Sequence, residues 1–178
     1  MDSINKNQPE DNHQDLSGQT AIKKLKQLID KASSCFFCTS VSRLNQFNTR
    51  PMSVLKTDDE GNLWFMSAKD SRKNREIGSV ANVRLLFQGD PHSDFLSLEG
   101  VASITTDKER IKELWNPMLK TWFTEGEDDP RISVIKVAIT DGYYWDTKHP
   151  TPVSFIKRII GAVVGKTLDD SVEGNLSV

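Results

Sequence analysis

The sequence has few of the residues that support extracellular, metal-binding or nucleic-acid-binding functions. Among 178 residues there are only two cysteines and three histidines, which excludes a disulfide framework and provides no metal-ligand spacing. The 23 basic and 25 acidic side chains give a net charge of -2, without the basic excess typical of nucleic-acid binders. No apolar run reaches the ~18 residues that span a membrane, and the polar N-terminus carries no secretory signal. We therefore expect a cytoplasmic protein with no metal and no nucleic-acid partner.

Motifs of several enzyme classes are also missing. The sequence has no glycine pattern for a nucleotide-binding loop and no Gly-x-Ser-x-Gly motif. Cys35 and Cys38 have the spacing of a redox pair, but they lie in an expected strand, where residues three apart point to opposite faces. We interpret both as structural cysteines. No acid or base can be assigned a catalytic role, so the catalytic residues stay unassigned.

The sequence predicts one folded domain between polar ends. Residues 1–19 are rich in Asn, Gln, Asp and Ser and bury too little apolar surface to offset their ordering entropy, so we expect a disordered tail. The folded domain is expected over residues 20–166. Apolar spacing within residues 153–166 predicts a C-terminal amphipathic helix that packs on the domain and does not bind a membrane surface. Residues 167–178 are expected to form a weakly ordered tail.

Apolar periodicity predicts a mainly β domain with peripheral helices. One helical stripe follows residue 20, and another over residues 107–123 is interrupted at Pro117. Gly100 predicts a bulge or bend within a long strand, and Asp141-Gly142 predicts a turn. The expected fold class is α+β, mainly β, with six to seven antiparallel strands in a barrel. The expected strands are 35–41, 50–57, 63–67, 82–89, 95–105 and 131–146, the last divided by the turn.

The segment DSRKNRE, residues 70–76, predicts an anion site at the start of a short helix. Asp70 or Ser71 is a suitable N-cap, which puts Arg72 and Lys73 in the first turn. Cations there oppose the helix dipole, at a cost of up to roughly 1 kcal/mol each. A phosphate would be attracted both by these cations and by the free backbone N–H groups. The alternative is a basic helix start that is simply exposed to solvent.

The segment RPMSVLK, residues 50–56, predicts an irregular or edge strand, because Pro51 removes a donor from the strand ladder. Arg50 adds a guanidinium group whose planar fork suits phosphate. The alternative is an ordinary edge strand that its proline protects against aggregation.

A hairpin is expected to join these two segments. We predict that strand 50–57 pairs with strand 63–67, which would place Arg50 at the same end of the sheet as Ser67 and the helix start. Three cations would then gather near one hydroxyl group without nearby acids. Such a cluster requires an anion.

The segments RPMSVLK, GNLWFMSAKDSRKNREIGSVANVRLLF, LSLEGVASI and DGYYWD, in this order, resemble the pyridoxamine 5'-phosphate oxidase-like split barrels. The resemblance covers about residues 20–146 and is greatest to the FMN-binding branch called general stress protein 26. It implies a six- to seven-stranded antiparallel split β-barrel with peripheral helices. It also implies FMN as the cofactor of domain 20–166, bound at the interface of a homodimer.

The resemblance implies a role for each segment. The Arg-Pro-Met strand would lie along the flavin, the next strand would place a hydroxyl near the ribityl chain, and the Ser-Arg-Lys stretch would hold the phosphate. A tryptophan from the other subunit would cover the flavin ring, although a core aromatic is the alternative. The implied cofactor-binding residues are Arg50, Pro51, Met52, Ser53, Met66, Ser67, Ser71, Arg72, Lys73 and Trp145.

Departures from the family pattern argue against vitamin B6 oxidation. The stretch FLSLEG lacks the glutamine that the true oxidases carry before the bend, and no Arg-rich close follows Trp145. We expect an FMN-binding flavoprotein of the general stress type, with an oxidoreductase reaction on a small molecule as its first candidate activity. The alternatives are a non-catalytic flavin-binding or flavin-buffering stress protein, and FAD or the deazaflavin F420 as the cofactor.

Overall fold

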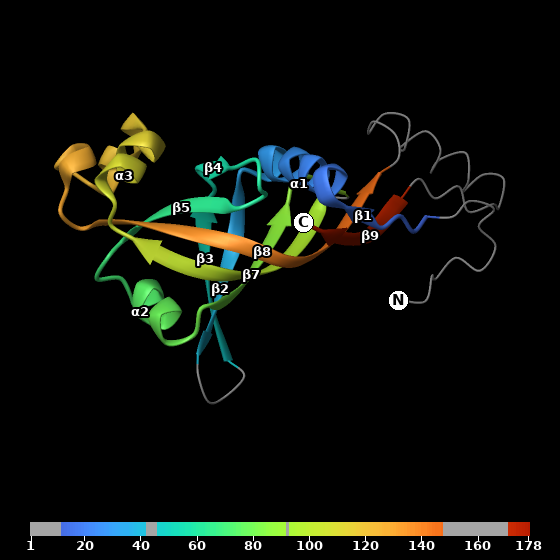
Figure 1. Ribbon diagram of the computed structural model, residues 1–178, viewed down its shortest axis with the longest axis horizontal. Helices are drawn as coiled ribbons and strands as arrows, with labels where there is room; N and C mark the ends of the chain where they lie inside the picture. The colour runs from blue at the N-terminus through green and yellow to red at the C-terminus, as the bar shows by residue number, and fades with distance from the viewer. Residues whose placement is uncertain (1–11, 42–45, 92, 148–170) are drawn as a thin grey trace.

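The computed structural model describes residues 12–41, 46–91, 93–147 and 171–178. The described residues form a mainly β fold with helices at its periphery (Figure 1), which confirms the predicted fold class. The elements in chain order are β1 (Leu16–Ser17), α1 (Gly18–Ala32), β2 (Ser34–Val41), β3 (Gln46–Ser53), β4 (Lys56–Thr57), β5 (Leu63–Ala68), α2 (Arg72–Ser79), β6 (Asn82–Gln88), β7 (Phe95–Thr105), α3 (Lys108–Leu114), the 3-10 helices η1 (Pro117–Thr121) and η2 (Gly126–Asp128), β8 (Ile132–Thr147) and β9 (Ser171–Ser177).

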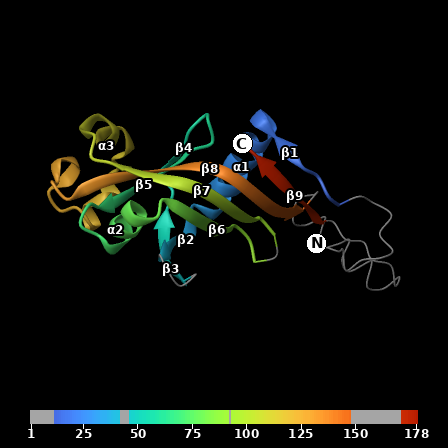
Figure 2. The same cartoon turned by 60° about the horizontal axis from the view of Figure 1, so that its bottom comes forward.

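A single sheet contains all nine described strands, and the long strand β8 connects its parts (Figures 1 and 2). The main order is β1-β9-β8-β7-β6-β2-β3, with β5 paired to β8 and β4 paired to β5. Strand β8 pairs with β5 near its start, with β7 along most of its length and with β9 near its end. All pairs are antiparallel except β1 with β9. Among the described strands β3 pairs only with β2, so the sheet does not close.

Two hydrophobic clusters pack against this sheet. In the larger one, the apolar stripe of α1, including Leu25 and Leu28, packs with strand residues such as Phe37 and Phe65. The rings of Phe37 and Phe65 meet edge to face at a centroid distance of 5.3 Å, a favourable aromatic geometry. The smaller cluster joins α3 and η1 to β5 and β8 through residues such as Ile111. The helices therefore cover apolar surface that the sheet leaves exposed.

Three local sequence predictions are confirmed. Helix α1 buries the predicted apolar stripe. The register of β7 against β8 shifts between Glu99 and Gly100, and a Cβ atom on Gly100 would lie 2.6 Å from the carbonyl oxygen of Ala138. Helix α3 ends at Leu114, and η1 starts again at Pro117.

The predicted hairpin pairing is confirmed only for its last two residues and is wrong for the segment around Arg50. Strand β3 pairs with β2, where Arg50 lies opposite Phe37, and only Lys56–Thr57 pairs with β5. Strand periodicity reports which residues alternate between faces, but it carries no information on the partner strand.

The predicted turn at Asp141-Gly142 is also wrong, since β8 runs without interruption through both residues. A Cβ atom on Gly142 would lie 2.8 Å from Cδ2 of Leu98 and 3.2 Å from Cβ of Leu176. This glycine therefore permits close packing between neighbouring strands and does not form a turn.

Both predicted tails are wrong where the structure describes them. The backbone N–H of Gln14 donates to the carbonyl oxygen of Glu173 at 2.8 Å, and Leu16 pairs with Leu176. Residues 171–177 form β9, whose alternate residues are buried. Glycine and polar residues made this segment look weakly ordered, but Val172 and Leu176 supply a strand-like apolar face. Residues 1–11 and the predicted helix at 153–166 lie outside the described residues.

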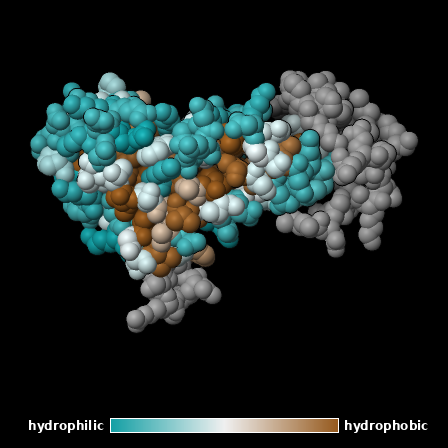
Figure 3. Space-filling model, in the orientation of Figure 1, coloured by the Kyte–Doolittle hydropathy of each residue, from teal (hydrophilic) through white to brown (hydrophobic). Residues whose placement is uncertain are grey.

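One face of the sheet carries apolar side chains that no described helix covers. Strand register places Pro51, Phe36, Leu86 and Tyr143 on one face. Phe36 is 58% exposed and Leu86 is 40% exposed, and hydrophobic residues form a band across the molecule in Figure 3. We call these four residues, together with Phe95 and Trp145 in the adjacent row, the outer apolar face. None of the described helices is both long and apolar enough to cross a membrane.

Candidate anion-binding site

The start of α2 and the end of β5 form a polar cluster. Ser71 is the N-cap of α2, and its Oγ accepts a hydrogen bond from the backbone N–H of Asn74 at 3.3 Å. Ser67 Oγ donates to Asn74 Oδ1 at 2.8 Å, and Lys73 Nζ donates to Ser67 Oγ at 2.5 Å. The structure thus confirms the predicted helix start and brings Ser67, Ser71 and Lys73 together.

Two residues that the sequence analysis missed, Asn74 and Ser133, attach this cluster to the sheet. Asn74 is buried, and its Nδ2 donates to Ser133 Oγ at 2.8 Å. Ser133 Oγ in turn donates to the carbonyl oxygen of Ser67 at 3.0 Å. These bonds fix α2 to β5 and β8, so the site rests on rigid elements. A lone Asn and a lone Ser give no signal in a sequence without a predicted pairing of β5 with β8.

Among the described residues, Lys73 is the cation of the site that has no matching acid. Burial, followed by the nearby charge of Arg50, lowers the pKa of Lys73 to about 8. Within the described part of the chain, its ammonium group bonds to a hydroxyl and forms no ion pair with a carboxylate. A partly buried cation beside another cation is stabilised by an anion.

Arg50 and Arg72 differ from Lys73, because both form ion pairs with Glu76. Arg50 Nη2 lies 2.7 Å from Glu76 Oε2, and Arg72 Nε lies 2.9 Å from Glu76 Oε1. The expectation of three cations without nearby acids is therefore wrong. Glu76 is four residues after Arg72, which is a spacing that favours an ion pair on a helix, so the sequence did contain this signal.

The structure separates the remaining predicted residues. Strand β3 alternates, so that Arg50 and Met52 face inward while Pro51 and Ser53 are exposed. Met52 packs against the larger hydrophobic cluster. The side chain of Met66 packs against the smaller hydrophobic cluster, on the opposite face from Ser67. The structure therefore does not bring the Met66 side chain into the polar cluster.

Trp145 lies far from the polar cluster of its own chain. Along β8 it is near the opposite end from Ser133, and at ~3.3 Å per residue the separation amounts to tens of ångströms. The centroid of its ring lies 4.7 Å from that of Tyr143, on the outer apolar face.

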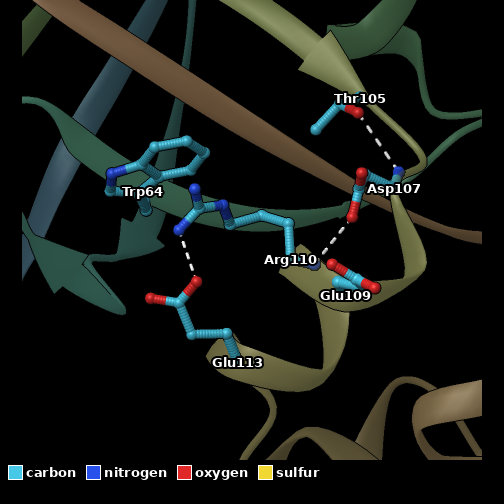
Figure 4. A pocket seen from close by; sticks show the side chains of 6 residues that line it. All are labelled: Trp64, Thr105, Asp107, Glu109, Arg110 and Glu113. Atoms are coloured by element: carbon cyan, nitrogen blue, oxygen red, sulfur yellow. Dashed lines mark hydrogen bonds and ion pairs between the residues drawn. The ribbon is translucent and has the colours of Figure 1, made fainter.

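A second hollow, between β5 and α3, is lined by charged groups, of which Asp107, Arg110 and Glu113 have partners (Figure 4). The guanidinium of Arg110 lies over the ring of Trp64, 4.4 Å from its centroid, and pairs with Glu113. Asp107 caps α3 by accepting from the backbone N–H of Arg110 at 2.8 Å. The contact of Arg110 with Trp64 attaches α3 to the sheet, while the other two interactions lie within α3 and its cap, so we interpret this hollow as structural.

The cysteines do not form a reactive pair. Cys35 and Cys38 are both buried and free, and burial raises the pKa of Cys35 to about 12. A thiol with so high a pKa is not a nucleophile near neutral pH. No group of His, Cys, Asp and Glu residues suitable for a metal ion occurs among the described residues.

The family model described as pyridoxamine 5'-phosphate oxidase like matches residues 20–169. The chain belongs to this family. Within the family it falls in the general stress protein 26 branch. Protein bli-3 of Neurospora crassa is 28% identical over 154 residues, which are 78% of this chain and 73% of the relative. General stress protein 26 of Bacillus subtilis is 28% identical over 95 residues, which are 52% of this chain and 67% of the relative.

Solved structures of the branch share the fold. General stress protein 26 from Bacillus anthracis is similar with a TM-score of 0.61 and 25% identity, over 69% of this chain and 92% of that chain. The general stress FMN/FAD binding protein from Xanthomonas citri is similar with a TM-score of 0.56 and 23% identity, over 67% of this chain and 82% of that chain. This last likeness concerns the fold alone.

Proposed function

We propose that this protein binds FMN and that the start of α2 holds the phosphate group. The observation that carries the proposal is Lys73, a partly buried cation that bonds to Ser67 and has no carboxylate partner among the described residues. The backbone N–H groups at the start of α2 and the hydroxyl of Ser71 lie in the same cluster. A phosphate bound there would receive charge-assisted hydrogen bonds.

The charges of Arg50, Arg72, Lys73 and Glu76 favour a phosphate monoester. Arg50, Arg72 and Lys73 contribute three positive charges, and Glu76 contributes one negative charge. A phosphate monoester carries about -1.5 to -2 charges at neutral pH, which balances the two positive charges that Glu76 leaves uncompensated. FMN ends in such a group, whereas the phosphates of FAD lie within a diphosphate bridge. The description of the Xanthomonas citri neighbour as an FMN/FAD binding protein agrees with a flavin and leaves both as ligands to compare.

We also propose that the protein is a homodimer whose outer apolar face is covered by a second copy. Phe36 and Leu86 are exposed apolar side chains on the same face of the sheet, and such a patch is typical of a surface that binds a partner. Pro51 is a residue of β3 on this face, and Arg50 lies on the opposite face of the same strand. A second copy seated here could bring its Trp145 to a flavin that lies along Arg50–Ser53.

The proposed activity is an oxidoreductase reaction on a small molecule. A bound flavin supplies electron transfer through its ring system, while the protein supplies binding and orientation. Residues Ser67, Ser71, Arg72 and Lys73 would hold the phosphate end. A flavin-buffering role is the alternative. Turnover of the bound flavin with reduced nicotinamides would support the oxidoreductase, and its absence would support buffering.

The test is a titration of purified, flavin-free protein with FMN, FAD, F420 and riboflavin, followed by flavin fluorescence. We expect FMN to bind most tightly and Lys73→Ala to weaken it by about a hundredfold, as expected for a charged hydrogen bond to phosphate. Arg75→Ala is the matched control, because Arg75 is an exposed cation of the same helix that bonds to the carbonyl oxygen of Asp70. Equal FMN affinity in both variants would refute the phosphate site, and tighter binding of F420 would replace FMN as the cofactor.

A further inference from the structure

Glu76 lies where three elements meet around the proposed phosphate site. It belongs to α2, and its side chain is only 11% exposed. Thr39 Oγ1 of β2 donates to its Oε2 at 2.6 Å. Arg50 Nη2 of β3 donates to the same oxygen at 2.7 Å, and Asn48 Nδ2 of β3 donates to Oε1. Arg72 Nε of α2 donates to Oε1 at 2.9 Å.

This set of donors fills the carboxylate. An ionised carboxylate has about four acceptor positions, and Glu76 receives four side-chain hydrogen bonds, two on each oxygen. Burial would raise the pKa of Glu76, but the hydrogen bonds from Thr39, Arg50 and Asn48 together lower it to about 2. Glu76 is therefore charged near neutral pH and has no free acceptor position for a ligand.

The two arginines are held by Glu76 in a way that leaves donors available. Arg72 is bound through Nε, and its two terminal amino groups form no hydrogen bond with the described residues. Arg50 uses one bond from Nη2 to Glu76 and one from Nη1 to Thr39, at 2.9 Å. A guanidinium has five N–H donors, so both arginines keep donors for an anion.

We infer that Glu76 is a positioning residue, which holds the guanidinium groups of Arg50 and Arg72 in place for the phosphate of the flavin. The inference rests on the proposed FMN site. Glu76 does not touch the ligand. It acts by reducing the conformational freedom that two long side chains would otherwise lose on binding.

Positioning and charge predict opposite effects when Glu76 is neutralised. Removing one negative charge from a site for an anion strengthens binding if only the net charge matters. Glu76→Gln also replaces one acceptor oxygen by an amide that donates, so it cannot accept from all four donors. If positioning dominates, binding of phosphate weakens although the site becomes more positive.

The experiment compares FMN and riboflavin affinities of the full-length wild type and Glu76→Gln. We expect FMN to bind about tenfold more weakly to Glu76→Gln, the size of one lost charged hydrogen bond, with riboflavin changed by less than about threefold. Glu99→Gln is the control, because Glu99 is an exposed carboxylate that also pairs with an arginine, Arg84. Unchanged or tighter FMN binding by Glu76→Gln would overturn the inference, and so would equal weakening of both ligands.

A second variant covers the case in which Glu76→Gln fails to fold. Asn48→Ala removes one donor to Glu76 without changing any charge, and it should weaken FMN binding by about threefold. FMN affinity equal to that of the wild type would count against the inference. Failure of the wild type to bind FMN at all would instead refute the proposed function, so the two failures can be distinguished.

Discussion

Lys73 is the residue in which the proposed site differs most from an ordinary helix start. Its neighbours Arg50 and Arg72 are balanced by Glu76, whereas Lys73 is held by a hydroxyl group at the end of β5. The lowered pKa of Lys73 is a consequence of burial and of Arg50. A bound phosphate would reverse this shift, because a nearby negative charge stabilises the protonated amine.

FMN affinity should therefore depend on pH through Lys73. Protonated Lys73 binds the anion better, so binding takes up a proton, and affinity should fall as the pH rises through the free-state pKa of about 8. We expect at least a tenfold loss between about pH 7 and about pH 9.5, measured by titration calorimetry in two buffers of different ionisation enthalpy. In Lys73→Arg the guanidinium stays charged over this range, and the loss should largely disappear. An equal loss in both proteins would assign the titration to another group.

Single residues of the site were predictable where the signal is local. Ser71 as N-cap and Lys73 in the first turn follow from spacing within one helix, and the pair of Arg72 with Glu76 follows from the same periodicity. Thr39 and Asn48 were not predictable, because they reach Glu76 only through the pairing of β2 with β3 and the packing of α2 on β2.

At the level of elements, periodicity located most strands but not their partners. The segment 50–57 was correctly read as a strand around Arg50–Ser53, yet its neighbour in the sheet is β2. At Gly142 the error concerns the element itself, since a glycine after an aspartate suggests a turn, whereas the residue lies within β8 where neighbouring strands approach closely. Both questions depend on contacts between distant segments, which one strand's pattern does not encode.

Strand β9 is an element that the sequence analysis missed, and its removal gives a clear test. Val172 and Leu176 are buried in the main core, and each contributes roughly 1.5–3 kcal/mol. Deleting residues 171–178 also removes the partner of β1. We expect loss of a large part of the unfolding free energy of a typical domain, about 5–15 kcal/mol.

The measurement is urea unfolding followed by circular dichroism. Leu176→Ala separates the packing contribution and should destabilise the protein by about 2–5 kcal/mol, while Ser177→Ala, at an exposed position of the same strand, should have little effect. A truncated protein as stable as the full chain would mean that β9 does not contribute to the folded core.

In the molecule as a whole, Trp145 and the polar cluster around Ser67 lie near opposite ends of strand β8. Strand β8 begins at Ile132, next to Ser133, which pairs with Ser67 of β5, and it continues to Trp145, whose row on the outer apolar face includes Phe95. One chain therefore cannot bring Trp145 to its own phosphate cluster. The proposed homodimer requires that each Trp145 lie near the other chain's cluster, and two-fold symmetry would make the two shared sites identical.

This arrangement predicts complementation between two defective subunits. Lys73→Ala and Trp145→Ala homodimers would each lack one component at both sites, so each should bind FMN weakly. In a mixed dimer, one site would take Lys73 from one subunit and Trp145 from the other, and it would be intact. Random mixing should restore tight binding to about one quarter of the sites, measured by FMN titration after subunit exchange.

Other roles of Trp145 predict different results in the same titration. If Trp145 has no role in binding, Trp145→Ala alone binds FMN like the wild type, and if it acts only within its own chain, mixing restores nothing. Phe36→Glu provides the independent control, because a charge at the centre of the outer apolar face should convert the proposed dimer to a monomer in light scattering. Loss of tight FMN binding together with the dimer would tie the flavin site to the interface, since Phe36 faces away from Lys73 on the other side of the sheet.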